Sequence, residues 1–216
     1  MEAPSSTIRE RSRSRRSAPV RGLAILALAA WLFPALSMAA APAERIRGTI
    51  DRVIGILKDP AMAGKEKREE RRRILRDEIA PVFDFGEMAK RSLGPNWRGR
   101  TTEEQDRFVA LFREILENSY LGKIESYQGE EIRYGRESIE GAYAEVKTLV
   151  VTRQGLEFPV DYRMLEGSSG YRIYDVVIEG ISLVGNYRSQ FNSILRKSSF
   201  QDMMDKLRAT IREQRS

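Results

Sequence analysis

The spacing of apolar residues changes at Gly129, and this change constrains the fold more than any other feature of the chain. Before this glycine, apolar residues recur with the period of a helix. After it they recur at every second position, as in strands. Four such segments follow, joined by short turns that contain glycine: residues 132–139, 143–153, 156–165 and 171–179. Turns of this length join antiparallel neighbours, so the sequence predicts a meander of four antiparallel strands.

The fourth of these segments is apolar on both faces. Ile173 and Val177 would share one face, and Tyr174, Val176 and Ile178 the other. A strand that is apolar on both sides is typical of the middle of a sheet. We therefore expect this strand to be central.

Amphipathic helices are expected on both sides of the meander. In the longest, Thr102 and Gln105 have the spacing of a capping box, and apolar residues then recur over about seven turns. The expected helices cover residues 44–58, 65–79, 84–93 and 102–127, with two more starting at Ser182 and Ser199. The predicted class is α+β: a curved, mainly antiparallel four-stranded sheet wrapped by about six helices, with an apolar pocket between sheet and helices.

The first 39 residues have the layout of a secretory signal peptide. A basic stretch from Arg9 to Arg21 precedes an apolar run from Leu23 to Phe33, and small residues follow up to Ala41. We expect cleavage after Ala39, so that residues 40–216 form the mature domain, with an uncleaved membrane anchor as the alternative. This leader carries a net charge of +4, which leaves only +2 for the remainder and argues against nucleic acid as a partner.

The chain contains neither histidine nor cysteine, which removes the usual general base, the usual nucleophilic thiol and the commonest zinc ligands. We therefore expect no enzyme activity, no cofactor and no metal. Asp161 and Asp175 lie in expected strands and could act as an acid/base pair. The interpretation that we favour is structural: pairing with a nearby arginine (Arg163, Arg172 or Arg188), or a position at the rim of the sheet.

The apolar face of the longest helix has two interpretations. Phe108, Phe112, Leu116 and Tyr120 would face the strand residues Val146, Val150, Val160 and Tyr162. Such a face is usually filled core. A curved sheet beneath long helices can also enclose a cavity, and an apolar cavity binds apolar ligands.

Several short strings of residues occur in an order that resembles a known family. They are Phe83-Asp84-Phe85, Leu93-Gly94 with Trp97, Glu104-Gln105 with Phe108 and Phe112, Asp161-Tyr162, Tyr174-Asp175, Glu179-Gly180-Ile181-Ser182-Leu183 and Asn186-Tyr187-Arg188-Ser189-Gln190-Phe191. Over residues 44–212 the chain resembles the periplasmic lipid carriers of the maintenance-of-lipid-asymmetry system, the MlaC-like or toluene-tolerance family. Tyr171 stands where the family pattern has Trp.

The resemblance implies a periplasmic carrier, expected to be a monomer, that holds phospholipid tails in a pocket between sheet and helices. It implies exchange of lipid with the substrate-binding ring of an inner-membrane ABC transporter and with an outer-membrane lipoprotein–porin complex. The alternatives are a carrier of hopanoids or other polycyclic lipids, and an adaptor that binds no lipid. Carried over to this chain, the expected lipid-binding residues are Phe85, Met88, Leu93, Phe108, Phe112, Leu116, Tyr120, Val146, Val150, Val160, Tyr162, Val177, Tyr187 and Phe191.

Overall fold

The structure is a computed structural model that describes residues 41–215. The predicted signal peptide and its cleavage site lie outside the described residues. Within residues 41–215, no helix is both long enough and apolar enough to cross a membrane.

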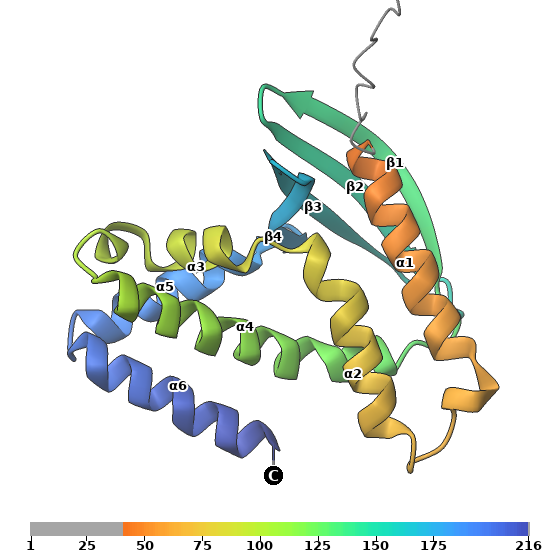
Figure 1. Ribbon diagram of the computed structural model, residues 1–216. Coiled ribbons are helices and arrows are strands. Elements are labelled where there is room, and N and C mark those ends of the chain that lie inside the picture. The colour runs from red at the N-terminus through yellow and green to blue at the C-terminus, as the bar shows by residue number, and fades with distance from the viewer. Residues whose placement is uncertain (1–40, 216) are drawn as a thin grey trace, which may run out of the picture. The chain divides into compact units, whose positions relative to one another are not determined.

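A curved antiparallel sheet forms one side of the described part of the chain (Figure 1). Its strands pair in sequence order, so the predicted meander is confirmed. A fifth strand of two residues, which the sequence analysis did not predict, extends it. The strands within residues 41–215 are β1 (Glu131–Glu140), β2 (Tyr143–Val151), β3 (Glu157–Gly167), β4 (Gly170–Ile178) and β5 (Ile181–Ser182).

The prediction that the fourth strand is central is wrong. Among the described residues, β4 is next to last in the sheet, and beyond it lie only β5 and a single parallel bridge from Phe83 to Ile173. The pairing of β3 with β4 shifts register between Arg163 and Met164. This irregularity breaks the alternation along β4, so Ile173 lies on the same face as Val176 and Ile178. The other face of β4 is buried because α5 packs on it.

The predicted helices are all present. In the part of the chain that the structure describes, the α-helices are α1 (Pro42–Lys58), α2 (Arg68–Ile79), α3 (Phe85–Leu93), α4 (Thr102–Glu125), α5 (Leu183–Leu195) and α6 (Phe200–Arg215). Short 3₁₀ helices lie between the early ones: η1 (Pro60–Met62), η2 (Ala80–Val82) and η3 (Gly94–Trp97).

The capping box at the start of α4 lies one residue earlier than predicted. The hydroxyl of Thr101 accepts a hydrogen bond from the backbone N–H of Glu104, and the carboxylate of Glu104 accepts one from the N–H of Thr101. Gln105, the predicted partner of Thr102, instead donates to the backbone carbonyls of Trp97 and Arg100. Two consecutive threonines followed by Glu-Glu-Gln allow either register, and in the structure Thr101 and Glu104 form the box while Gln105 is engaged by the preceding loop.

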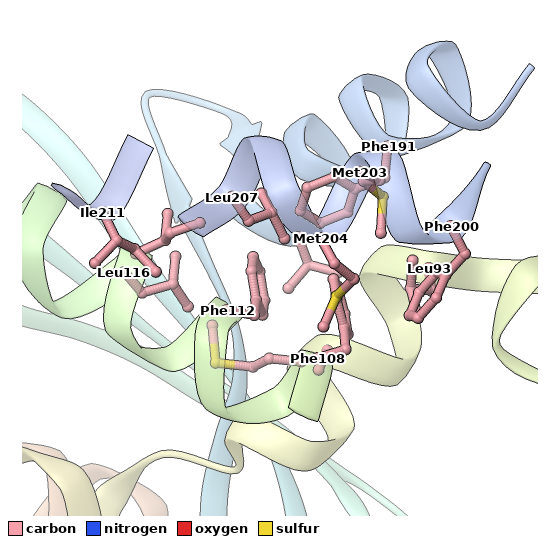
Figure 2. Packing of buried hydrophobic residues seen from close by; sticks show 14 of the residues in the cluster. Leu93, Phe108, Phe112, Leu116, Phe191, Phe200, Met203, Met204, Leu207 and Ile211 are labelled. Atoms are coloured by element: carbon pink, nitrogen blue, oxygen red, sulfur yellow. The ribbon is translucent and has the colours of Figure 1, made fainter. Parts of the chain in front are cut away.

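The buried apolar residues form two clusters instead of one. The helical cluster joins α3, α4, α5 and α6, and Figure 2 shows its rings and sulfur atoms converging between α4 and α6. The sheet cluster joins the sheet to the start of α1 and comprises Ile46, Val82, Ala144, Val146, Met164, Tyr171, Ile173 and Val176. Phe83 packs against both clusters.

Candidate ligand-binding cavity

A cavity of about 620 Å³ lies between the sheet and helices α1, α2 and α4. Its size falls within the range of about 300–1,000 Å³ that is common for small-molecule sites. Most of its lining is aliphatic or aromatic: α1 contributes Ile46, Ile50, Val53, Ile54 and Leu57, and the strands contribute Ile132, Val150, Phe158, Val160, Tyr162, Ile173, Val176 and Ile178.

The two ends of the cavity differ in their exposure to solvent. Met88 on α3 and Ile173 on β4 are among the fully buried residues, so they mark a closed end. The exposed residues of the lining are Lys123 and Ser126, at the end of α4. The cavity therefore opens to solvent beside the last turn of α4, near Tyr127 and Glu130. We call this opening the mouth.

The space stays open because α1 touches the sheet mainly through its first turns. Ile46 is buried in the sheet cluster. Further along the same apolar face of α1, Val53, Ile54 and Leu57 are only half-buried. Val150 and Phe158 on the strands are half-buried too. These side chains line the same space and no other part of the described chain fills it. Apolar surface left uncovered in this way is typical of a ligand site.

Seven of the fourteen predicted lipid-binding residues line the cavity. They come from three parts of the chain: the short helix α3, the C-terminal half of α4, and the strands β2 and β3. They are Phe85, Met88, Leu116, Tyr120, Val150, Val160 and Tyr162.

The other seven lie away from the lining. Leu93, Phe108, Phe112 and Phe191 are buried in the helical cluster (Figure 2). Tyr187 packs against this cluster, with its ring next to those of Phe112 and Phe191. Val146 belongs to the sheet cluster. Val177 is buried next to Val176, which does line the cavity, and its backbone pairs with Ser182 of β5.

The expectation that Phe108 and Phe112 face the strands is wrong. Their rings stack with centroids 5.7 Å apart, and the ring of Phe191 on α5 meets them edge-on at 5.5 and 5.7 Å. Helix α6 packs along α4, so the aromatic face is covered by helices (Figure 2). A helical period identifies an apolar face but not its partner.

Helix α1 lines the cavity, although none of its residues is among the predicted lipid-binding residues. Ile46, Ile50, Val53, Ile54 and Leu57 have the spacing of one face of the expected helix over residues 44–58, but no property of the sequence distinguishes such a face from a filled contact. The same holds for Ile124 in the last turn of α4 and for Tyr127 just after the helix.

Few polar groups interrupt the lining. Arg76 pairs with Glu117, with 3.7 Å between Nε and Oε2. Burial raises the pKa of Tyr162 to about 12, because the phenolate would lose its hydration among apolar neighbours. This group is therefore neutral at physiological pH and adds no charge to the cavity.

The two strand aspartates have structural partners. Asp175 is only 4% exposed; its carboxylate accepts hydrogen bonds from the N–H of Val184 (3.0 Å), the hydroxyl of Ser182 (2.6 Å) and the guanidinium of Arg163 (3.3 Å). This confirms the favoured interpretation for Asp175. Asp161 pairs with Lys147 at 3.8 Å instead of with an arginine. Neither residue lines the cavity.

The fold and the cavity together define a class of protein. A curved sheet and surrounding helices that leave an apolar cavity open to solvent are suited to holding an apolar ligand. Within residues 41–215, no group of three or more acidic residues is placed to hold a metal ion.

Comparison with known proteins assigns the chain to a family. The model of the MlaC protein family matches residues 47–209, so the chain belongs to the MlaC family. It is 26% identical over 185 residues to the toluene tolerance protein ttg2D of Pseudomonas putida, covering 82% of this chain and 83% of that one. It is 20% identical over 142 residues to the intermembrane phospholipid transport system binding protein MlaC of Haemophilus influenzae, covering 63% and 66%.

A solved structure shares the fold. The phospholipid-binding protein of Ralstonia solanacearum, solved in complex with a phospholipid, superposes with a TM-score of 0.74 at 21% sequence identity. The match covers 82% of this chain and all of that one. The α+β class and the sheet-and-helix architecture predicted from the sequence are therefore confirmed.

Proposed function

We propose that this protein is a periplasmic carrier that holds the acyl chains of a phospholipid in the cavity and moves the lipid between the two membranes. The observation that carries the proposal is the apolar cavity of about 620 Å³, whose exposed lining residues lie at the end of α4. Membership of the MlaC family and the phospholipid bound to the Ralstonia solanacearum protein support it.

The free energy of the tails explains why a carrier needs this cavity. Each buried CH₂ group contributes about 0.8 kcal/mol, so one 16-carbon tail in water costs about 12 kcal/mol. The cavity replaces a hydrocarbon bilayer by a hydrocarbon-like lining, so transfer from bilayer to carrier is nearly neutral. The carrier then sets no direction of transport by itself. We infer that its two partners set the direction of transport. They are an inner-membrane ABC transporter with a substrate-binding ring and an outer-membrane lipoprotein–porin complex.

Lipid contact is assigned to the predicted residues that line the cavity: Phe85, Met88, Leu116, Tyr120, Val150, Val160 and Tyr162. The residues of the helical cluster, such as Phe112, instead support the wall that α4 forms. The proposal includes export under the leader of residues 1–39 with cleavage after Ala39, and action as a monomer without a cofactor.

Native mass spectrometry of the gently purified protein tests the proposal. We expect about one bound lipid per chain, identified after extraction as a phospholipid. Preparations that stay free of lipid and also take up no labelled phospholipid from vesicles would contradict it. If a hopanoid is extracted instead, the protein is still a lipid carrier, but its ligand is a polycyclic lipid and not a phospholipid.

A matched pair of variants on β2 connects lipid binding to the cavity. Val150→Asp places a carboxylate in the apolar lining, and we expect lipid occupancy to fall more than about tenfold because the charge would be buried beside hydrocarbon. Leu149→Asp is the control: Leu149 does not line the cavity, and its cross-strand neighbours are Arg133 and Pro159, so the same substitution adds a carboxylate outside the cavity. Circular dichroism must show that both variants are folded. Equal lipid content in the two variants would refute the assignment.

A further inference from the structure

Three basic side chains surround the mouth without a carboxylate partner. Within residues 41–215, Lys58, Lys123 and Arg153 form no ion pair, whereas most of the other lysines and arginines there do. Lys123 lines the cavity and is exposed, with its ammonium group 5.0 Å from the centroid of the Tyr120 ring. The ammonium group of Lys58 lies 5.9 Å from the ring centroid of Tyr127, another lining residue.

The side chain of Arg153 lies against the loop that follows α4, and this loop borders the mouth. Its guanidinium lies so close to Gly129 that a Cβ atom at this position would be 3.2 Å from Nη2. Gly129 also has φ +99°, which an L side chain rarely adopts. Glycine at this position therefore lets the guanidinium lie against the loop between Tyr127 and Glu130, both of which line the cavity.

Few carboxylates are placed to neutralise these three charges. Of the two acidic residues in the lining, Glu117 is paired with Arg76 and with Arg113, which leaves Glu130. Glu125, in the last turn of α4, is also engaged: it accepts hydrogen bonds from Arg71 and from Arg72, and Arg68 lies 4.0 Å away. The mouth therefore has an excess of positive charge.

From this charge distribution, and on the basis of the proposed function, we propose that the mouth selects phospholipids whose headgroup carries a net negative charge. A lipid whose tails fill the cavity places its phosphate at the mouth, within reach of the ammonium and guanidinium groups. A headgroup with an amine brings a positive charge to the same place and is repelled. A glycerol headgroup leaves the phosphate charge uncompensated and is attracted.

The expected selectivity is modest because the three side chains are exposed to solvent. Exposed ion pairs are weak individually, so three of them together should give about a three- to tenfold preference. The preference should shrink in about 1 M salt, where the screening length falls to about 3 Å.

Competition between two lipids in the same membrane tests the inference. The lipid-free protein is incubated with vesicles that contain equal amounts of phosphatidylglycerol and phosphatidylethanolamine with identical acyl chains. The protein is then separated and its lipid quantified by mass spectrometry. Because both lipids share one vesicle, attraction of the protein to the membrane surface favours neither. We expect phosphatidylglycerol to be enriched about three- to tenfold at low salt and the enrichment to shrink in 1 M salt.

Two triple variants with the same change in net charge locate the effect. Lys58→Gln, Lys123→Gln and Arg153→Gln together should bring the ratio of the two lipids close to one. The control combines Arg196→Gln, Lys197→Gln and Lys206→Gln, none of which lines the cavity, and should keep the preference. Equal uptake of the two lipids by the wild-type protein would overturn the proposed headgroup selection. So would a preference that persists in 1 M salt or in the first triple variant. None of these results would contradict the proposed carrier function. A wild-type protein that takes up neither lipid overturns both proposals.

Discussion

Replacing Asp175 with alanine should destabilise the fold much more than the same change at Asp161. The two aspartates look alike in the sequence, since each lies in a strand and neighbours an aromatic residue. They differ in their surroundings: Asp175 is buried and connects β4 to the first turn of α5, whereas Asp161 has one basic partner, Lys147, whose side chain is half exposed.

The structure sets the size of the effect. Without the carboxylate, the N–H of Val184, which is 3% exposed, loses its hydrogen-bond acceptor, at a cost of about 1–3 kcal/mol. Loss of a negative charge at the N-terminus of α5 costs about 0.3–1 kcal/mol more. Arg163 keeps Glu145 at 3.5 Å and is partly solvated, so it adds little. We expect the free energy of unfolding to fall by about 3 kcal/mol for Asp175→Ala and by less than about 1 kcal/mol for Asp161→Ala.

Urea unfolding of the lipid-free protein, followed by circular dichroism, measures both variants. With a denaturant slope of about 2 kcal/mol per molar, the midpoint should shift by about 1.5 M for Asp175→Ala and by less than about 0.5 M for Asp161→Ala. Folded protein of either variant should still take up lipid, because neither residue lines the cavity. Equal shifts for the two variants, or loss of lipid uptake by folded Asp175→Ala, would refute this reasoning.

Two further predictions concern the helix start and the cavity tyrosine. Thr101→Ala should lower the free energy of unfolding by about 1 kcal/mol because it removes the capping hydroxyl of α4, whereas Thr102→Ala should change it by less than about 0.5 kcal/mol; equal effects in urea unfolding would place the cap elsewhere. The pKa of Tyr162 is raised from 10.0 to about 12 by burial, so above pH 10 the unfolded chain loses this proton first. Stability should therefore fall by about 1.4 kcal/mol per pH unit between about pH 10 and 12 because of this group, and Tyr162→Phe should remove that part of the decrease.

Much of the local structure could be predicted because local patterns carry it. The change of period at Gly129 located the start of the sheet, and the short glycine turns determined that its strands run antiparallel in sequence order. The errors arose where two local solutions were equally good. Thr101 and Thr102 offer overlapping capping boxes, and β4 is apolar on both faces for a reason that strand patterns do not reveal, the packing of α5 on its outer face.

By itself the sequence determined the class of fold, the order of its elements, and the absence of histidine and cysteine chemistry. Family-specific strings of residues pointed to a lipid carrier, and the match to the MlaC family agrees with them. Only the tertiary structure decided which apolar faces are filled and which stay open. Phe112 and Val150 are equally apolar in the sequence; α5 and α6 cover Phe112, whereas the half-buried stripe of α1 stands opposite Val150 across the cavity. The physical reason is that the spacing of apolar residues along the sequence identifies the face of the element on which they lie. Whether a cavity forms depends instead on how closely two elements that are distant in the chain approach each other.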